Sequence, residues 1–179
     1  FWLIGCFLTL KSNQIYKLLG NYFLWVANPF CIFAFLLRVS MIYITRKEHF
    51  NAAHKLYREE WSQEKNEEVF GRCANANWHG HNYDLFVTIK GQINPETGFV
   101  VDLKDLKDII LTHVVDKLDH RNLNLDVDFM KGKMASTEVL AIEIWKQLEP
   151  HIIAKNAQLH CIKLYETASN FVEYFGENG

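Results

Sequence analysis

The sequence lacks three patterns that would each point directly to a class of function. Its four cysteines (Cys6, Cys31, Cys73 and Cys161) are widely scattered and include no Cys-x-x-Cys pair, which excludes a dense disulfide framework and favours a reducing, cytoplasmic setting. No glycine-rich dinucleotide motif is present, so we expect no external redox cofactor. No basic patch is interleaved with aromatic residues, and we therefore expect no binding to nucleic acid.

Acidic residues are missing from the first 40 positions. This segment holds Lys11, Lys17 and Arg38, three of the 19 lysines and arginines, and none of the 21 acids. The rest of the 179-residue chain is therefore mildly acidic. The composition, 49% hydrophobic and 22% charged, is that of a globular protein with one domain and an appendage.

The appendage contains a charge-free run over residues 18–37, which has about the length that spans a membrane. We consider two interpretations: a membrane anchor, or a reading frame that starts too early, with Met41 as the true initiator. We favour the second, because asparagines and a proline interrupt the run and a globular pattern begins directly at Met41. The predicted organisation is an N-terminal extension over residues 1–40 and one domain over residues 41–179, without membrane contact.

Residues 41–179 read as strands and helices with few interruptions. The expected elements are a strand over 41–53 that ends near His54, a loop or short helix over 55–72, a strand over 81–93, a turn over 94–98, a helix from Asp102 to Val114, a helix from Ser136 to Leu148, and a hairpin over 158–167 and 171–175. This order predicts an α+β fold, with one antiparallel four-stranded sheet and two helices on one face.

The apolar positions predict which faces are buried. In the second strand His81, Tyr83, Leu85, Val87 and Ile89 share one face. In the helices the expected buried residues are Leu103, Leu106, Ile110 and Val114 of the first and Leu140, Ile144, Trp145 and Leu148 of the second, which we expect to end before Pro150. In the first strand of the final hairpin Glu166 is expected to share a face with His160, Ile162 and Leu164.

The stretch CANANWHGHNY, Cys73 to Tyr83, contains the residues most typical of a metal site. His79 and His81 are separated by one residue at the start of a strand, so they point to the same face. An antiparallel partner strand would bring His54 alongside them. Three imidazoles with an open fourth position are typical of a catalytic zinc site, although His-x-His also occurs by chance on protein surfaces.

Cys73 lies in a polar loop that leads directly to the paired histidines. A nearby cation would lower the pKa of its thiol and make a thiolate available as a base. Alternatively Cys73 is a fourth metal ligand, which would close the site, or a small buried apolar residue. The sequence pattern leaves these alternatives open.

Two further positions carry charges suited to catalysis or binding. Asp119 and His120 follow the first helix, where they form either an acid–base relay or a simple polar cap. Glu166 ends an otherwise apolar strand face, where a carboxylate needs a partner. A flat heterocycle with two N–H donors is one such partner, and solvent at a frayed strand end is the other.

Five motifs in order make the domain similar to a known family. They are Phe50-Asn-Ala-Ala-His54, Cys73 with His79-Gly-His-Asn-Tyr83, Leu118-Asp-His-Arg-Asn-Leu123, Ser136-Thr-Glu138 and Leu164-Tyr-Glu-Thr167. From Met41 to about Glu177 the chain resembles the 6-pyruvoyl-tetrahydropterin synthase family, which includes the 6-carboxytetrahydropterin synthases of queuosine biosynthesis.

The resemblance implies roles for nine residues. His54, His79 and His81 would bind Zn²⁺, Cys73 would be the proton-abstracting base, Asp119 and His120 would complete its relay, and Glu166 would anchor the pterin ring with help from Ser136 and Thr137. The implied substrate is 7,8-dihydroneopterin triphosphate. The implied assembly is the tunnelling fold, in which subunits join their sheets into a barrel and trimers stack into a homohexamer with active sites between subunits.

The chain departs from the family pattern at three positions. The motif Cys-Asn-Asn reads Cys-Ala-Asn here, Trp78 replaces a common glycine, and Asn124 replaces a common aspartate. The indole of Trp78 is expected to narrow or reshape the pocket. None of these changes affects a proposed ligand or catalytic group.

The resemblance leaves alternative functions. The pyruvoyl branch of the family eliminates triphosphate and keeps the side-chain carbons, whereas the carboxy branch also releases acetaldehyde. Five residues separate Cys73 from His79, as in pyruvoyl-type enzymes, and we favour that product. A non-catalytic metal- and pterin-binding module is disfavoured because Cys73, Asp119 and His120 are all present. A structural zinc protein is disfavoured because three histidines are not what holds an α+β core together.

Overall fold

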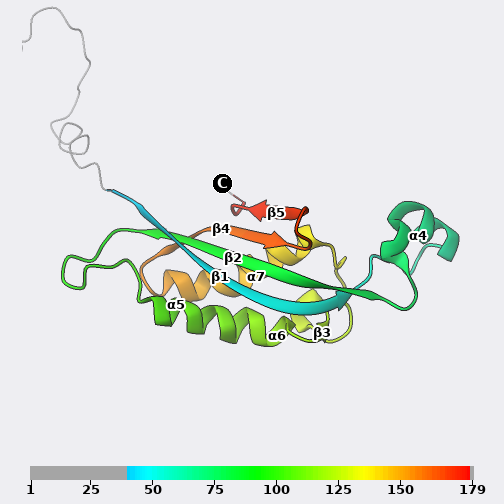
Figure 1. The fold of residues 1–179 in the computed structure, drawn as a ribbon, viewed down its shortest axis with the longest axis horizontal. Coiled ribbons are helices and arrows are strands. Elements are labelled where there is room, and N and C mark those ends of the chain that lie inside the picture. Colours follow the sequence, from blue (N-terminus) through cyan, green and yellow to red (C-terminus); the bar gives the residue numbers. More distant parts are fainter. Residues whose placement is uncertain (1–39, 178–179) are drawn as a thin grey trace, which may run out of the picture. The chain divides into compact units, whose positions relative to one another are not determined.

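The computed structural model describes residues 40–177 (Figure 1), and the apolar run over residues 18–37 lies outside them. Within the described residues no helix combines the length and the apolar character needed to cross a membrane. The strands are β1 (Ile42–His54), β2 (His79–Gly91), β3 (Arg121–Asn122), β4 (Gln158–Tyr165) and β5 (Phe171–Tyr174). The α-helices are α4 (Gln63–Phe70), α5 (Leu103–Ile110), α6 (Asp116–Leu118) and α7 (Thr137–Ile153).

The five strands form one mixed sheet in the order β3-β1-β2-β4-β5. Neighbouring strands are antiparallel except for β3, which runs parallel to β1 and pairs only with Ala52 and Ala53. The predicted four-stranded antiparallel sheet is therefore corrected to five strands with one parallel edge. The two residues of β3 are too few to carry a pattern of alternation.

The hairpin of β1 and β2 is the longest element of the sheet (Figure 1). Every residue of β1 has a partner in β2, from Ile42 opposite Gly91 to His54 opposite His79. The alternation predicted for β2 is confirmed, since Tyr83, Leu85, Val87 and Ile89 are buried on the face covered by the helices.

Helices α5 and α7 cover that face (Figure 1). Each begins at the predicted cap: Asp102 accepts a hydrogen bond from the Lys104 amide, and Ser136 accepts one from the Val139 amide. The predicted inward residues of α7 are buried. The predicted burial of Leu103 is wrong: this residue lies in the first turn of α5, where it is 57% exposed.

Helix α7 also extends past its predicted end. Pro150 lies inside its last turns, and the helix ends at Ile153. Proline removes one backbone donor, but Pro150 is exposed, so the carbonyl that loses its partner can reach water. The apolar Ile152, fully buried on the core side, keeps the final turn attached.

A β-bulge changes which face His160 occupies. The pairing of β2 with β4 shifts between Thr88 and Ile89, so that Cys161 is opposite Thr88 and Leu159 is opposite Ile89. Two residues of a bulge oppose one partner residue, which interrupts the alternation. His160 lies against Tyr43 and Phe175, and not with the buried Ile162 and Leu164 as predicted.

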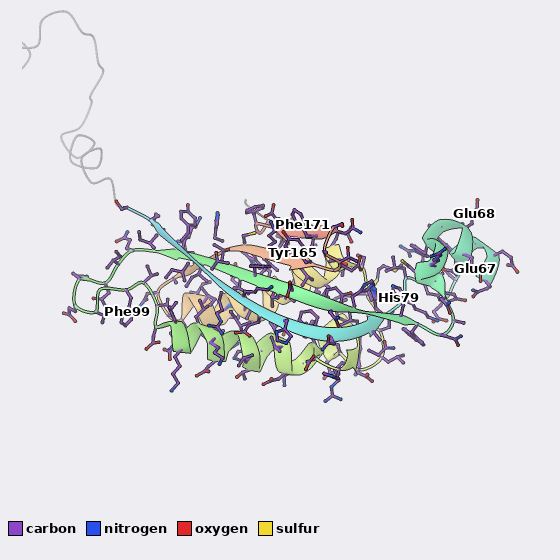
Figure 2. All side chains as sticks on the ribbon, viewed as in Figure 1. Glu67, Glu68, His79, Phe99, Tyr165 and Phe171 are labelled. Atoms are coloured by element: carbon purple, nitrogen blue, oxygen red, sulfur yellow. The ribbon has the colours of Figure 1, made fainter. Side chains whose placement is uncertain are left out.

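The face of the sheet away from the helices carries aromatic and charged side chains. Tyr165 and Phe171 lie next to each other there, with ring centroids 4.6 Å apart (Figure 2). Lys163 lies over the Phe171 ring, at 4.1 Å from its centroid. At the end of the hairpin, α4 carries the exposed Glu67 and Glu68 (Figure 2), and it is the short helix expected between residues 55 and 72.

Candidate metal centre and active site

Three histidine side chains meet where β1 ends and β2 begins. His54 ends β1 directly opposite His79, which begins β2. His81 lies two residues further along β2 and therefore points to the same face as His79. The ring centroids of His54 and His79 are 4.5 Å apart, and His81 lies 5.1 Å from the first and 5.0 Å from the second. The structure thus brings together the three ligands predicted from the sequence.

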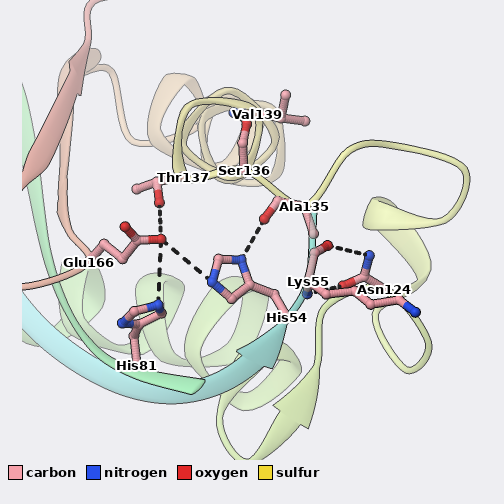
Figure 3. Close-up of polar contacts among 9 residues, drawn as sticks. All are labelled: His54, Lys55, His81, Asn124, Ala135, Ser136, Thr137, Val139 and Glu166. Atoms are coloured by element: carbon pink, nitrogen blue, oxygen red, sulfur yellow. Dashed lines mark hydrogen bonds and ion pairs between the residues drawn. The ribbon is translucent and has the colours of Figure 1, made fainter. Parts of the chain in front are cut away.

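His54 presents a free ring nitrogen to this cluster. Its Nδ1 lies 2.7 Å from the carbonyl oxygen of Ala135 (Figure 3), and because a carbonyl only accepts hydrogen bonds, Nδ1 carries the proton. The lone pair is then on Nε2, which is buried and has no hydrogen-bond partner among the described residues. Burial lowers the pKa of His54 and favours the neutral imidazole that a metal requires.

The other two histidines are also suited to a metal ion. Burial lowers the pKa of His79 and of His81, and Nδ1 of His79 is buried without a partner within residues 40–177. One ligand nitrogen from each of the three rings lies within 4.8 Å of the others. Neutral imidazole nitrogens are donors that zinc accepts, so the donor set fits this ion.

Glu166 lies beside the histidines, directly after β4. Its Oε1 accepts a hydrogen bond from the Thr137 hydroxyl over 2.8 Å (Figure 3). The same oxygen lies 3.6 Å from Nε2 of His54 and 3.8 Å from Nε2 of His81. Hydrogen bonds within the described residues engage only this oxygen, and the side chain is 25% exposed. The carboxylate is thus held in place and still reachable by a ligand.

Cys73 is a half-buried free thiol on a short 3₁₀ helix, Gly71–Ala74. Its carbonyl accepts a hydrogen bond from the Leu56 amide over 2.9 Å, which joins this turn to the segment just after β1. Cys73 lines a cavity of about 250 Å³. Phe171 also lines this cavity, as do four other residues, all of them predicted site residues: His54, Ser136, Thr137 and Glu166. The cavity lies at the N-terminus of α7, where backbone N–H groups favour negative charge.

Asp119 and His120 form a pair, but not in this cavity. Oδ2 of Asp119 lies 2.9 Å from Nδ1 of His120, and Oδ1 accepts the backbone N–H of Asn51 over 2.8 Å. That N–H holds the pKa of Asp119 below its usual range. The imidazole of His120 is 79% exposed and lines a separate hollow with Asn51 and Gly80. Within one chain, therefore, the pair is not brought together with Cys73.

Asn124 supports the metal cluster from outside. Its Nδ2 donates a hydrogen bond to the Lys55 carbonyl and its Oδ1 accepts one from the Lys55 amide, both over 3.1 Å (Figure 3). Both polar backbone groups of the residue after His54 are thus held by one side chain. A neutral amide can donate and accept in this way, whereas an aspartate could only accept, which gives this departure from the family pattern a structural role.

Trp78 adopts a backbone conformation that a bulky residue rarely takes, with φ of 66°. Glycine takes this conformation without strain. The indole lies over the Lys55 ammonium, at 4.7 Å from the ring centroid, and Tyr57 lies on the same ammonium at 4.4 Å. Trp78 is not among the residues that line the cavity of Cys73, and its expected effect on the shape of the pocket stays a prediction.

Tyr83 lies next to the histidine cluster, a position for which the sequence pattern predicts only burial. The centroid of its ring lies 5.7 Å from that of His81 and 6.3 Å from that of His54. Its hydroxyl is buried and has no hydrogen-bond partner in the described part of the chain, and burial raises its pKa. The available signal was its position two residues after His81 on the same strand face.

The domain matches a known protein family over nearly all of its described length. A family model described as 6-pyruvoyl tetrahydropterin synthase matches residues 43–177. A Dictyostelium discoideum protein named 6-pyruvoyl tetrahydrobiopterin synthase is 43% identical over 136 residues, which cover 76% of this chain and 97% of that protein. The human protein of the same name is 40% identical over 134 residues, which cover 75% of this chain and 91% of the human protein.

The fold is similar to that of a solved structure with the same name. The structure of Caenorhabditis elegans 6-pyruvoyl tetrahydropterin synthase superposes with a TM-score of 0.72 at 36% identity. It covers 79% of this chain, and the alignment includes 100% of the Caenorhabditis elegans chain. Sequence and fold therefore agree on one family.

Proposed function

The chain belongs to the 6-pyruvoyl tetrahydropterin synthase family, a family of lyases, and we propose that it converts 7,8-dihydroneopterin triphosphate to 6-pyruvoyl tetrahydropterin with elimination of triphosphate. The observation that carries the proposal is the cavity shared by Cys73, Glu166 and His54, which places a thiol, a carboxylate and a proposed metal ligand around one space of about 250 Å³. Tetrahydrobiopterin biosynthesis in the cytoplasm is the setting that we propose for this reaction.

We propose Zn²⁺ as the cofactor, held by His54, His79 and His81. These residues supply three neutral nitrogen donors, the ligand class that suits zinc. When bound, the ion supplies a Lewis acid that makes a C–H proton next to a coordinated substrate oxygen easier to remove. With only three protein ligands, the ion would keep a coordination position for substrate, unlike the ion of a structural site with four protein ligands.

The substrate ring is held by Glu166 in this proposal. Two neighbouring N–H donors of a pterin match a carboxylate, which accepts hydrogen bonds at both oxygens. The hydroxyl of Thr137 fixes one oxygen of Glu166 in advance, so less orientational freedom is lost on binding. Ser136, which caps α7 and lines the same cavity, would complete the contact to the ring.

Cys73 is the proposed general base. Its free, half-buried thiol lies on a turn that lines the cavity, and a thiolate can take a proton from the substrate side chain. Internal proton transfer then reduces the ring while the side chain is oxidised and triphosphate leaves, so that no external oxidant is required. Asp119, 2.9 Å from Nδ1 of His120, would orient the imidazole for the return of a proton.

The separation of His120 from the cavity supports a site built from more than one subunit. We propose that the relay pair reaches the cavity of a neighbouring copy in a homohexamer of two stacked trimers. Two sheet edges are available for joining subunits into a barrel: β5, and the part of β1 before Ala52 that β3 does not cover. Unpaired strand edges favour pairing with another chain.

The test of the proposed reaction is a product assay on the zinc-loaded protein with dihydroneopterin triphosphate. We expect triphosphate to be released without acetaldehyde, together with a pterin of the mass of the pyruvoyl product. Acetaldehyde released in step with triphosphate would instead identify the carboxy-type reaction. Neither product, with zinc bound and the fold intact, would overturn the assignment as an enzyme and favour a binding module.

Mixing two inactive variants tests the shared site. Cys73→Ala and His120→Ala should each lose activity, and dissociated and reassembled mixtures should recover roughly a quarter of it, because about one site in four then combines two intact residues from different subunits. If both residues act within one chain, mixing restores nothing.

A further inference from the structure

Glu143 is a buried carboxylate that the proposed reaction does not use. It lies on α7, and its side chain is only 6% exposed. Its Oε2 is 2.7 Å from Nζ of Lys133, and its Oε1 is 2.9 Å from Nζ of Lys146. Among the described residues it is the only buried carboxylate. The two ammonium groups together compensate the buried negative charge, which would be costly to leave unpaired.

The two lysines differ in what they connect. Lys146 lies three residues after Glu143 on the same helix, so that ion pair stays within α7. Lys133 lies in the loop that precedes α7, and its ammonium also donates a hydrogen bond to the Phe129 carbonyl over 2.7 Å. Its backbone N–H donates to the Met130 carbonyl over 3.0 Å. Lys133 therefore closes the loop on itself and attaches it to the side of α7.

The far end of this loop reaches the metal cluster. Ala135 is fully buried two residues after Lys133, and its carbonyl is the group that accepts the Nδ1 proton of His54 (Figure 3). This hydrogen bond sets the tautomer and the plane of the His54 ring, and so the direction of the Nε2 lone pair. Partners of this kind tune metal affinity as the ligands themselves do.

We propose that Lys133 and Glu143 are positioning residues for the metal ligand His54: their ion pair holds the loop that carries the Ala135 carbonyl, and the carbonyl orients the imidazole. The inference rests on the proposed metal centre and adds residues that lie outside it. It assigns a function to the buried charge of Glu143, which packing alone does not explain, since a neutral residue of similar size would fill the same space.

The two lysines provide a matched pair of variants. Lys133→Met and Lys146→Met each remove one ammonium from Glu143 and keep the length of the side chain. Only the first detaches the loop. We expect Lys133→Met to weaken zinc binding about 10-fold, the lower end of the effect seen for residues that orient a ligand, while Lys146→Met changes it less than threefold. Lys133→Arg keeps the charge and the donors and should restore most of the affinity.

Zinc affinity is measured on the full-length protein by competition with a chromophoric chelator, and the free energy of unfolding of each variant is measured beside it. A second readout needs no metal: the Nδ1 proton of His54 in the metal-free protein, followed by ¹H–¹⁵N NMR. Buried donation to Ala135 should make this proton slow to exchange in wild type and in Lys146→Met. In Lys133→Met its exchange should be at least tenfold faster.

The outcomes separate this inference from the proposal on which it rests. Wild-type protein that binds no zinc would refute the metal centre, and the NMR comparison would still test the loop. Equal zinc affinities and equal exchange of the His54 proton in the two methionine variants would overturn the role of Lys133 and Glu143. The role of Lys133 and Glu143 would also be overturned if both methionine variants lost the same zinc affinity and the same free energy of unfolding. That result would show only a structural effect of the ion pairs.

Discussion

His54 and His79 are direct cross-strand partners, the last residue of β1 opposite the first of β2, with ring centroids 4.5 Å apart. The register of one long hairpin therefore builds the cluster of histidines that we propose as metal ligands. A slip by one residue would turn the ligands of one strand to the other face. The core residues Phe50, Tyr83 and Leu85 lie on the same strands, so packing of the core and alignment of the ligands depend on the same pairing.

Removal of the metal should leave the fold intact. The histidines sit at one end of a core formed by residues of β1, β2, β4 and the helices, so the core does not depend on an ion. We expect the chelator-treated protein to keep its far-UV circular dichroism spectrum and to melt at a lower temperature. Zinc at 100 times its dissociation constant should add about 2.7 kcal/mol to the free energy of unfolding. Loss of the spectrum on chelation would favour a structural zinc protein.

Thr137→Val should raise KM for the pterin substrate and leave kcat nearly unchanged. The hydroxyl of Thr137 holds Oε1 of Glu166, and a hydrogen bond to a charged group contributes about 1.5–3 kcal/mol. Part of that energy is expected in substrate binding, as a roughly 10-fold increase in KM. Thr137→Ser keeps the hydroxyl and serves as the control. An equal loss in kcat at constant KM would show that the contact acts in the transition state instead.

Tyr83→Phe should not destabilise the metal-free protein. The hydroxyl is buried without a partner within residues 40–177, and a buried unpaired polar group costs about 1–3 kcal/mol. Its removal should therefore raise the free energy of unfolding, by about 1 kcal/mol, as measured in urea. Tyr165→Phe, at a half-buried position, should change little. A loss of stability in Tyr83→Phe would show that the hydroxyl is satisfied in solution.

Asp119 should make a pH-dependent contribution to stability. The backbone N–H of Asn51, and then the nearby His120, hold the pKa of Asp119 below its ordinary value of 3.8. A carboxyl with a lowered pKa in the folded state stabilises above its unfolded pKa and loses this effect as pH falls through the folded pKa. Wild type should therefore exceed Asp119→Asn in stability at pH 6, and the difference should begin to shrink at about pH 4 and disappear as pH falls through the lowered folded pKa.

Urea unfolding across this pH range checks the expectation for Asp119. Because the side chain is 38% exposed, solvent screening should keep the effect small. Asp116→Asn, at an exposed position of α6, is the matched control. A constant difference between wild type and Asp119→Asn from pH 3 to pH 7 would contradict the assignment.

Much of the local structure follows from the sequence alone. The alternation in β2 correctly predicts that Tyr83 to Ile89 face the core at every second position, because side chains of a strand alternate with a fixed period. Asp102 and Ser136 mark the starts of α5 and α7, because their side chains satisfy free amides of the first turn. The final hairpin was also predicted from its turn residues and β-forming residues. These features depend on residues close together in the sequence.

Features that join distant segments were missed or wrongly predicted. The two residues of β3 pair with β1 across about 70 positions, and the bulge that moves His160 arises from how β4 meets β2. Pro150 stays inside α7 because burial of Ile152 supports the last turn. In each case tertiary contacts overcome a local preference, and the pattern of a few consecutive residues does not predict these contacts.

For the site, the sequence by itself determined the types of residue: three histidines, a thiol, a carboxylate and an Asp–His pair, at spacings that indicate a metal and proton transfer. Only the tertiary structure decided their grouping. Strand register brings His54 onto His79, the N-terminus of α7 brings Thr137 onto Glu166, and the turn after α6 directs His120 away from the cavity of Cys73. The chemistry of a side chain is a local property, whereas the distance between two side chains depends on every hydrogen bond and packing contact that connects them.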